Sequence, residues 1–376
     1  MKRWPIAVVL LAGLLALAAC AAEEKGTPAP AGSTAATQDL WQQEWDQLVQ
    51  AAKKEGKVAV VGPVGPDNRR AHIEPFEKKY GISVDYLGVQ GPEFTPRLEA
   101  ERGAGQYLWD VYIGGITHMV PLLPKGFFDP IGPALVLPEV KEPQNWQGGK
   151  GLYFFDKERL VVMMSLQTSG AWVYNPGMVD PKQFKSWKDL LDPKWKGKVL
   201  LHDPRVTGTG QSRLQFFYMH PELGIDYIRA LAPQVVLGRD FRQQIEWVAQ
   251  GRYPLLIAPN ESLADQLIKE GMPVAKLDHR QLKEGGYLAG GTGFLILFSK
   301  PAHPNAAKLY VNWLLSREGQ TEFTKGASIP SLRVDTPTDH IDPMRLPVVG
   351  YLNTGNEEAH VLRQKIADIA NEIFRD

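Results

Sequence analysis

Short runs of apolar, often β-branched residues alternate with helical segments along the first third of this chain. Residues 57–61, 82–87 and 110–113 are typical of strands, and the segments at 67–80 and 93–104 that separate them are typical of helices. Strands that alternate with helices of this length favour βαβ units on a mostly parallel sheet. The pattern therefore predicts an α/β protein.

The alternation continues in the rest of the chain with different residues, and a last helix is predicted at 362–373. Further strands are predicted at 159–166, 171–174, 199–201, 235–237, 255–257 and 294–298. A length of 376 residues is enough for two domains, each with its own core. Two such halves leave a cleft between them, and ligands of open α/β sheets bind beyond the carboxyl ends of the strands.

Residues 1–19 are typical of an export signal, with a basic start and an apolar run shorter than the roughly 20 residues of a membrane-spanning helix. The run ends at Leu17-Ala18-Ala19-Cys20, which resembles the lipobox of bacterial lipoproteins and contains the only cysteine. The resemblance implies cleavage before Cys20 and a diacylglycerol anchor on its sulfur. A plain signal peptide cut elsewhere is the alternative. Residues 20–38, rich in small residues and proline, are predicted to be a flexible tether.

Charge and cysteine content exclude several classes of protein. Lys+Arg 42 balances Asp+Glu 42, so the chain lacks the excess basic charge of a nucleic-acid binder. A single cysteine excludes an internal disulfide framework and a cysteine-cluster metal site. The common catalytic motifs are absent and the histidines are scattered, which predicts a binding protein rather than an enzyme, with no cofactor and no resident metal.

The most informative loop follows the strand predicted at 199–201. It reads Asp203-Pro204-Arg205-Val206-Thr207-Gly208-Thr209-Gly210-Gln211 and leads into a helix predicted to begin near Ser212. Glycines allow successive backbone N–H groups to point at one place, threonine hydroxyls add donors, and the helix start adds roughly half a positive charge. The loop therefore predicts an anion site. A capped turn that holds only solvent is the alternative.

Several blocks together resemble the extracellular solute-binding proteins of ABC importers, in the branch around ferric-iron and organophosphonate binders. The resemblance covers about residues 41–376. It rests on Trp109-Asp110-Val111-Tyr112, Trp172-Val173-Tyr174-Asn175-Pro176, Trp187-Lys188-Asp189-Leu190-Leu191-Asp192-Pro193-Lys194-Trp195-Lys196-Gly197-Lys198, the loop at 203–210, and Trp313-Leu314-Leu315-Ser316-Arg317-Glu318-Gly319-Gln320.

The family resemblance implies two hinged lobes of the type II periplasmic-binding-protein-like fold. It implies residues 41–160 with 289–340 in one lobe, and 161–288 with 341–376 in the other. The protein would be a monomer on the periplasmic or extracellular face of the cell envelope, held to the membrane by its lipid, that passes a small solute to a permease and ATPase complex. A surface hydrolase on the same fold is the alternative, but no nucleophile with a positioned base is evident.

The chain departs from the iron-binding members of that branch. Those carry adjacent tyrosines after the strand that corresponds to 255–257, and this chain has Pro259-Asn260-Glu261-Ser262 there. Ferric iron requires hard anionic oxygens, and Gly114-Gly115 supplies no carboxylate after the third strand. We therefore expect an anionic organic solute, with ferric iron as the alternative.

The candidate ligand-binding residues follow strands that should end at the cleft, or lie where the chain crosses between the lobes. They are Asn68, Arg69, Gly114, Gly115, Thr117, Trp172, Arg205, Thr207, Gly208, Thr209, Arg239, Arg242, Asn260 and Glu261. An arginine beside a Gly/Thr loop suits a carboxylate or phosphonate, because its planar fork contacts two oxygens at once. A core position is the alternative for Trp172, and a solvated face for Arg239 and Arg242. Glu261 would bind an ammonium group or, alternatively, cap the following helix.

Overall fold

The computed structural model describes residues 33–89 and 91–375, and the fold lies in the unit Trp41–Asp376. The expected export signal, Cys20 and tether residues 20–32 lie outside the described residues. Helix α1 spans Ser33–Glu55, so the prediction of a flexible tether is wrong for residues 33–38, which are helical. No helix within the described ranges is long and apolar enough to cross a bilayer.

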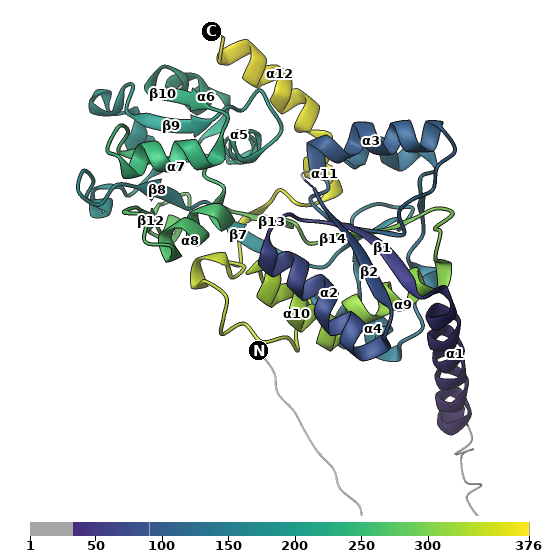
Figure 1. The fold of residues 1–376 in the computed structure, drawn as a ribbon. Helices are drawn as coiled ribbons and strands as arrows, with labels where there is room; N and C mark the ends of the chain where they lie inside the picture. Colours follow the sequence, from purple (N-terminus) through teal and green to yellow (C-terminus); the bar gives the residue numbers. More distant parts are fainter. Residues whose placement is uncertain (1–32, 90, 376) are drawn as a thin grey trace, which may run out of the picture. The chain divides into compact units, whose positions relative to one another are not determined.

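The first sheet has the strand order β2-β1-β3-β14-β6-β5, and β4 also pairs with β14. Figure 1 labels β1, β2 and β14 of this sheet. The strands are β1 Lys57–Gly62, β2 Ser83–Gly88, β3 Val111–Gly114, β4 Phe128–Asp129, β5 Tyr153–Phe154, β6 Val161–Met163 and β14 Phe294–Phe298. Strand β1 is parallel to both neighbours, whereas every pairing of β14 is antiparallel. Strand β14 therefore joins this sheet from a distant part of the chain.

Helices cover the first sheet and supply its aromatic core. They are α2 Pro66–Tyr80, α3 Gly91–Gly103, α4 Pro138–Lys141, α9 Pro304–Leu315 and α10 Arg317–Ala327. Phe76 of α2 lies with its ring centroid 4.9 Å from Tyr310 and 5.3 Å from Trp313, both on α9. All three side chains are fully buried, so the two helices are joined by apolar packing.

The second sheet has the order β10-β9-β11-β8-β12. Its strands are β8 Trp172–Tyr174, β9 Val199–His202, β10 Val235–Gly238, β11 Leu255–Leu256 and β12 Ala275–Leu277. Its helices are α5 Thr209–Met219, α6 Gly224–Leu231, α7 Phe241–Ala249 and α8 Glu261–Lys269, and the C-terminal helix α12 Arg363–Ile373 contacts α5. The apolar clusters of this sheet are separate from that of the first sheet, as two lobes require.

Both sheets are mixed rather than mostly parallel, which corrects the prediction. Strands β9, β10 and β11 run parallel, but β8 is antiparallel to β11 and β12. Helical crossovers connect the parallel strands, whereas β8 follows an extended connection from the first sheet. The direction of such a strand is set by the connection and not by a βαβ unit.

A small third sheet lies on the connections between the two large ones. It consists of β7 Gln167–Ser169, β13 Tyr287–Ala289 and β15 Leu352–Asn353. The chain passes from β6 through β7 to β8, returns from β12 through β13 to β14, and passes through β15 to α11 Glu357–Val361 and α12. Contacts group residues 41–376 as one unit, so the predicted lobe boundaries stay a prediction.

Candidate functional site

The two connections through β7 and β13 approach each other at glycines. A Cβ on Gly170 would lie 2.9 Å from the Cα of Gly286, and one on Gly286 would lie 2.3 Å from the carbonyl oxygen of Ser169. Neither distance is possible for a real side chain without a shift of the backbone. The crossing between the lobes therefore depends on the absence of side chains at both positions.

Glu261 and Arg213 hold the peptide groups of this crossing. The Glu261 carboxylate accepts hydrogen bonds from the Ser169 hydroxyl at 2.7 Å and the Gly170 N–H at 3.0 Å. Arg213 donates to the Gly170 carbonyl at 3.1 Å. Asn260, not Glu261, caps α8, because its side chain accepts from the N–H of Leu263 at 3.1 Å. Glu261 thus fixes the connection, and its proposed role toward an ammonium group is untested.

The anion loop ends earlier than predicted, because α5 begins at Thr209 rather than near Ser212. The Thr209 hydroxyl donates to the Ala258 carbonyl at 2.6 Å, whereas the Thr207 side chain is exposed. The N–H of Ser212 is bonded to the Gly208 carbonyl at 3.2 Å. The preceding amides, at residues 209–211, lie in the first turn and have no acceptor within the helix. The helix start therefore presents donors, as an anion site requires.

Two of the predicted arginines are engaged by Asp203 instead of facing a ligand. Arg205 donates to the Asp203 carboxylate at 3.0 Å and to the Phe374 carbonyl at 3.0 Å, and Arg239 donates to the same carboxylate at 2.9 Å. Burial alone would raise the pKa of Asp203, but the hydrogen bonds from the two arginines lower it overall. This group fixes the end of α12 to the loop after β9.

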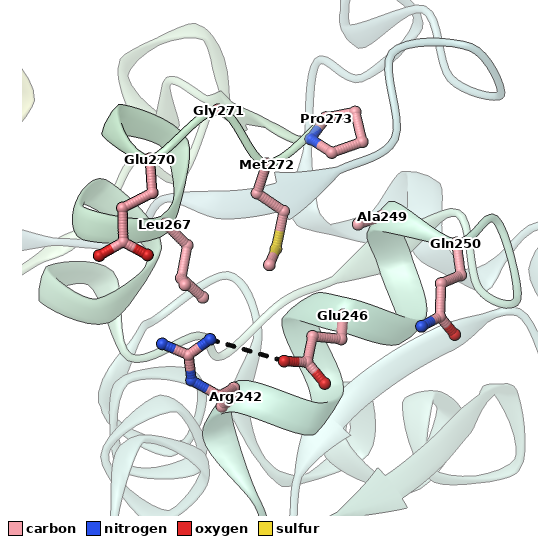
Figure 2. Close-up of a pocket in the computed structure, with 9 residues that line it drawn as sticks. All are labelled: Arg242, Glu246, Ala249, Gln250, Leu267, Glu270, Gly271, Met272 and Pro273. Carbon is pink, nitrogen blue, oxygen red and sulfur yellow. Dashed lines mark ion pairs between the residues drawn. The ribbon is translucent and has the colours of Figure 1, made fainter.

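The other two predicted arginines also contact their own chain. Arg69 donates to the Tyr86 carbonyl at 3.0 Å. Arg242 forms an ion pair with Glu246 at 3.6 Å, one turn along α7, and both side chains are about half-exposed. Arg242 and Glu246 line a cavity of about 430 Å³ between α7, α8 and the turn after α8, and no strand contributes to this cavity (Figure 2). Arg242 therefore lies on a solvated face, the alternative reading of its position.

Trp172 is a core residue, which corrects its assignment to the site. Its side chain is 0% exposed, and its ring centroid lies 5.0 Å from Phe184 and 4.9 Å from Trp187. The aromatic residues of the Trp187 block fold back onto β8 and cover it. A solute cannot contact Trp172 unless this core opens.

The loop after β3 is shaped by Tyr112. Its hydroxyl donates to the Gly115 carbonyl at 2.8 Å and lies 3.1 Å from Nε2 of His118. A Cβ on Gly114 would lie 2.5 Å from this hydroxyl, so the tyrosine can fold back only because residue 114 is glycine. Thr117 in the same loop is partly exposed. Asn68, next to Arg69 on α2, is apart from this loop in the sequence. Its amide donates to the Val64 carbonyl at 3.2 Å.

The sequence did not point to Arg363, which lies next to the start of α5. Arg363 is the first residue of α12, and its guanidinium donates to the Gln211 side chain at 3.4 Å. Burial lowers the pKa of Arg363 to about 10, which still leaves it positively charged at neutral pH. The only signal in the sequence was an arginine at the start of the last helix, and it lies 152 residues after Gln211, which it contacts.

Two histidines lie within the electrostatic reach of Arg363. The pKa of His118 is lowered to about 4 and that of His360 to about 3, mainly by burial and in part by the charge of Arg363. His360 contacts Phe155 of the first lobe with ring centroids 4.8 Å apart. Both imidazoles are therefore neutral at pH 7. In the described part of the chain, no group of three or more His, Cys, Asp or Glu residues could hold a metal ion.

Residues 71–335 match the sequence profile of the bacterial extracellular solute-binding proteins. The chain belongs to this family. Membership makes it a solute-binding protein of the ABC-transporter type, with a small solute and a permease as partners, on the periplasmic or extracellular side. An uncharacterized protein of Haemophilus influenzae is 27% identical over 294 residues, which cover 73% of this chain and 79% of that protein.

Solved structures of other binding proteins share the fold. The periplasmic binding protein AfuA of Actinobacillus pleuropneumoniae, with fructose-6-phosphate bound, is 18% identical with a TM-score of 0.62, over 85% of this chain and 98% of that one. Iron-bound HitA of Pseudomonas aeruginosa is 16% identical with a TM-score of 0.63, over 84% and 99%. The two-lobe periplasmic-binding-protein fold is thereby confirmed. At these identities the likeness carries no information on the solute.

Proposed function

We propose that this solute-binding protein captures a small anionic organic solute between its lobes and delivers it to an ABC permease and ATPase complex. One observation carries the proposal: a charged arginine, Arg363, lies 3.4 Å from Gln211 in the first turn of α5, where backbone amides have no acceptor in the helix. A guanidinium beside a helix start favours negative charge in two independent ways.

The same chemistry argues against ferric iron as the solute. Iron needs several hard anionic oxygens, whereas the start of α5 offers N–H donors and a cation. The segment Pro259–Ser262 after β11 contains no tyrosine, and the Glu261 carboxylate is already hydrogen-bonded to the lobe crossing. An organic acid, phosphate or phosphonate suits these groups better.

We further propose that the protein is a monomeric lipoprotein, anchored through Cys20 at the outer face of the membrane. The support is the lipobox-like sequence and the single cysteine. A protein with Cys20→Ser should leave the membrane fraction or remain as the uncut precursor. A variant that fractionates and migrates like the wild type would contradict the anchor and leave solute binding untouched.

Solute binding is tested by a thermal-shift screen of the whole protein in detergent, with matched panels of carboxylates, phosphonates, sugar phosphates and neutral sugars. We expect the largest shifts among the anions. Calorimetry on Thr207→Ala should then show binding weakened roughly 10- to 150-fold, because a hydrogen bond to a charged group contributes about 1.5–3 kcal/mol. Thr338→Ala removes an exposed threonine far along the chain and serves as the matched control.

Three outcomes of these experiments would overturn part of the proposal. One is a neutral sugar as the tightest ligand, the second is stoichiometric iron retained through gel filtration, and the third, unchanged affinity in Thr207→Ala, would remove only the role of the loop at 203–211. Each of them leaves the membership of the family intact.

A further inference from the structure

The loop after β3 contains a histidine whose proton position is fixed by its neighbours. The Tyr112 hydroxyl has a single proton, and it donates this proton to the Gly115 carbonyl at 2.8 Å. Burial raises the pKa of Tyr112, so the phenol keeps that proton at neutral pH. Nε2 of His118 lies 3.1 Å from the same hydroxyl oxygen, which can only accept a hydrogen bond from the imidazole. His118 is therefore protonated at Nε2, and its Nδ1 carries a lone pair.

A second histidine, on α11, is fixed in the opposite tautomer. Nδ1 of His360 lies 3.2 Å from the Asn356 carbonyl, and a carbonyl oxygen can only accept a hydrogen bond. Nδ1 therefore carries the proton, and Nε2 carries the lone pair. Burial is the main reason that the pKa is about 4 for His118 and about 3 for His360, so both rings are neutral at pH 7. Each histidine thus presents one hydrogen-bond acceptor.

Neither of these acceptors has a donor in the described part of the chain. Nδ1 of His118 and Nε2 of His360 are both buried, and both lack a hydrogen-bond partner. Buried polar atoms in folded proteins are almost always paired, because an acceptor that loses water without gaining a donor destabilises the fold. The two lone pairs therefore indicate a group that is not part of the protein and that donates hydrogen bonds.

Both histidines lie where elements of the two lobes meet. His118 follows β3 of the first sheet, and the ring of His360 packs edge-on against Phe155, directly after β5, with the centroids 4.8 Å apart. Arg363 is the first residue of α12, and its charge contributes to the lowered pKa of both histidines. The two acceptors and this guanidinium therefore belong to one neighbourhood, which a solute between the lobes can contact.

The charge of Arg363 decides which kind of donor suits the two lone pairs. An ammonium group and a hydroxyl group can both donate to an imidazole nitrogen. The guanidinium repels an ammonium group, whereas it leaves a neutral hydroxyl unaffected. A hydroxyl oxygen can also accept a hydrogen bond, and Nε of Arg363 is a further buried atom without a partner. Hydroxyl groups therefore match this neighbourhood better than ammonium groups.

We propose that His118 and His360 are specificity-determining residues that accept hydrogen bonds from hydroxyl groups of the solute. The solute is then a hydroxylated anion. This inference rests on the proposed function and deepens it, because it names a second functional group of the solute, apart from the anionic one. A solute of equal charge that lacks the hydroxyl groups leaves both lone pairs unpaired, so it binds less tightly.

The test compares pairs of probes that differ by one or more hydroxyl groups, by calorimetry on the whole protein in detergent. The pairs are malate and succinate, citrate and tricarballylate, glycerol 3-phosphate and propyl phosphate, and the neutral pair xylitol and 1,5-pentanediol. We expect the hydroxylated member of the best-bound anionic pair to bind roughly 5- to 150-fold more tightly. In His118→Phe this ratio should fall toward one, because the ring remains and the acceptor is lost. His340→Phe, the same substitution at an exposed histidine, should keep the wild-type ratio.

A second variant separates the loss of an acceptor from a disturbed loop. His118→Asn places a side-chain oxygen where Nδ1 lies, so it should keep part of the preference that His118→Phe loses. Equal binding of both members of every pair by the wild type overturns the inference, and so does a preference that persists in His118→Phe. If anions bind without regard to their hydroxyl groups, the proposed function stands and this inference fails. If xylitol binds tightest and depends on His118, the anionic solute fails and the role of the histidines stands.

Discussion

Arg333 and Arg345 lie on the segment between α10 and β15, whereas Arg213 and Arg363 lie on α5 and α12. The first two are as deeply buried as Arg213, with 1–2% exposure, and each contacts carboxylates of its own chain. Arg213 and Arg363 contact none within ion-pair distance in the described part of the chain. We call the first region complete, because carboxylates balance the charges of its arginines, and the second region incomplete, because none does.

The difference separates cations that hold the fold from cations that are available to a ligand. Arg333 also donates to the carbonyls of Glu139 and Leu315, both at 3.2 Å. Its guanidinium group is therefore already bonded to the protein itself. Arg213 donates once, to the crossing peptide of Gly170, and its remaining charge lies over the Trp187 ring at 4.7 Å. Arg363 has only a long hydrogen bond to Gln211. Its charge is the least compensated of the four.

Acid should have the largest effect, and it should act through three buried histidines. Burial lowers the pKa of His118 and of His72, in the core of the first lobe, to about 4, and that of His360 to about 3. The unfolded chain protonates these imidazoles near pH 6.5, so stability is complete above that pH and falls as the pH falls toward 4. The loss is about 3 kcal/mol for each histidine at pH 4.

Urea unfolding between pH 7.5 and 4, followed by tryptophan fluorescence, measures the acid effect. His360→Gln should flatten the profile, whereas replacement of the exposed His340 by Gln should not change it. A profile that is flat from pH 7.5 to 4 would contradict this account.

Arg333→Gln should be the most damaging of the arginine substitutions. It leaves two carbonyls without their donor, and a buried acceptor left unpaired costs about 1–3 kcal/mol in free energy of unfolding, whereas the carboxylates of Glu139 and Asp335 are partly exposed to water. Arg363→Gln, the same substitution in the incomplete region, should stay within about 1 kcal/mol of the wild type. Denaturant unfolding of the two variants measures these losses of stability. Equal losses of free energy of unfolding would contradict the difference between the two regions.

Arg213→Met should have the smallest effect. It loses the hydrogen bond to Gly170 and the contact with the Trp187 ring, but it no longer buries an unpaired charge, so the net change should be about 1 kcal/mol in either direction. The unfolding midpoint in urea measures it. A loss as large as that of Arg333→Gln would show that Glu261, on the other side of the Gly170 peptide, pairs with Arg213 strongly through that group.

The local pattern of the sequence was sufficient for most elements but not for their arrangement. The run at 294–298 is strand β14 as predicted, because an apolar run bounded by glycine and proline has few other solutions. That β14 inserts between β3 and β6 depends on contacts over more than a hundred residues, which periodicity does not encode. The strand expected at 159–166 is only Val161–Met163, since the chain leaves the sheet there to cross between the lobes.

The candidate site was predicted only in part for the same reason. The loop at 203–211 does lead into a helix start, which spacing and residue type could indicate. The sequence could not indicate which arginine faces this helix start. The arginines nearby in the sequence are bound to Asp203, and Arg363 belongs to the C-terminal helix. The apolar stripe of that helix predicted its buried face and gave no sign of a role for its first residue.

The most direct test is a crystal structure of the protein soaked in selenate, a tetrahedral oxyanion whose selenium is located by its anomalous signal. We predict a peak within hydrogen-bond distance of the Arg363 guanidinium and the first-turn amides of α5, and no such peak in Arg363→Gln. A peak at Arg242 on the α7 surface, or at Arg69, with none at Arg363 would contradict the account, and so would the same peak in crystals of the variant.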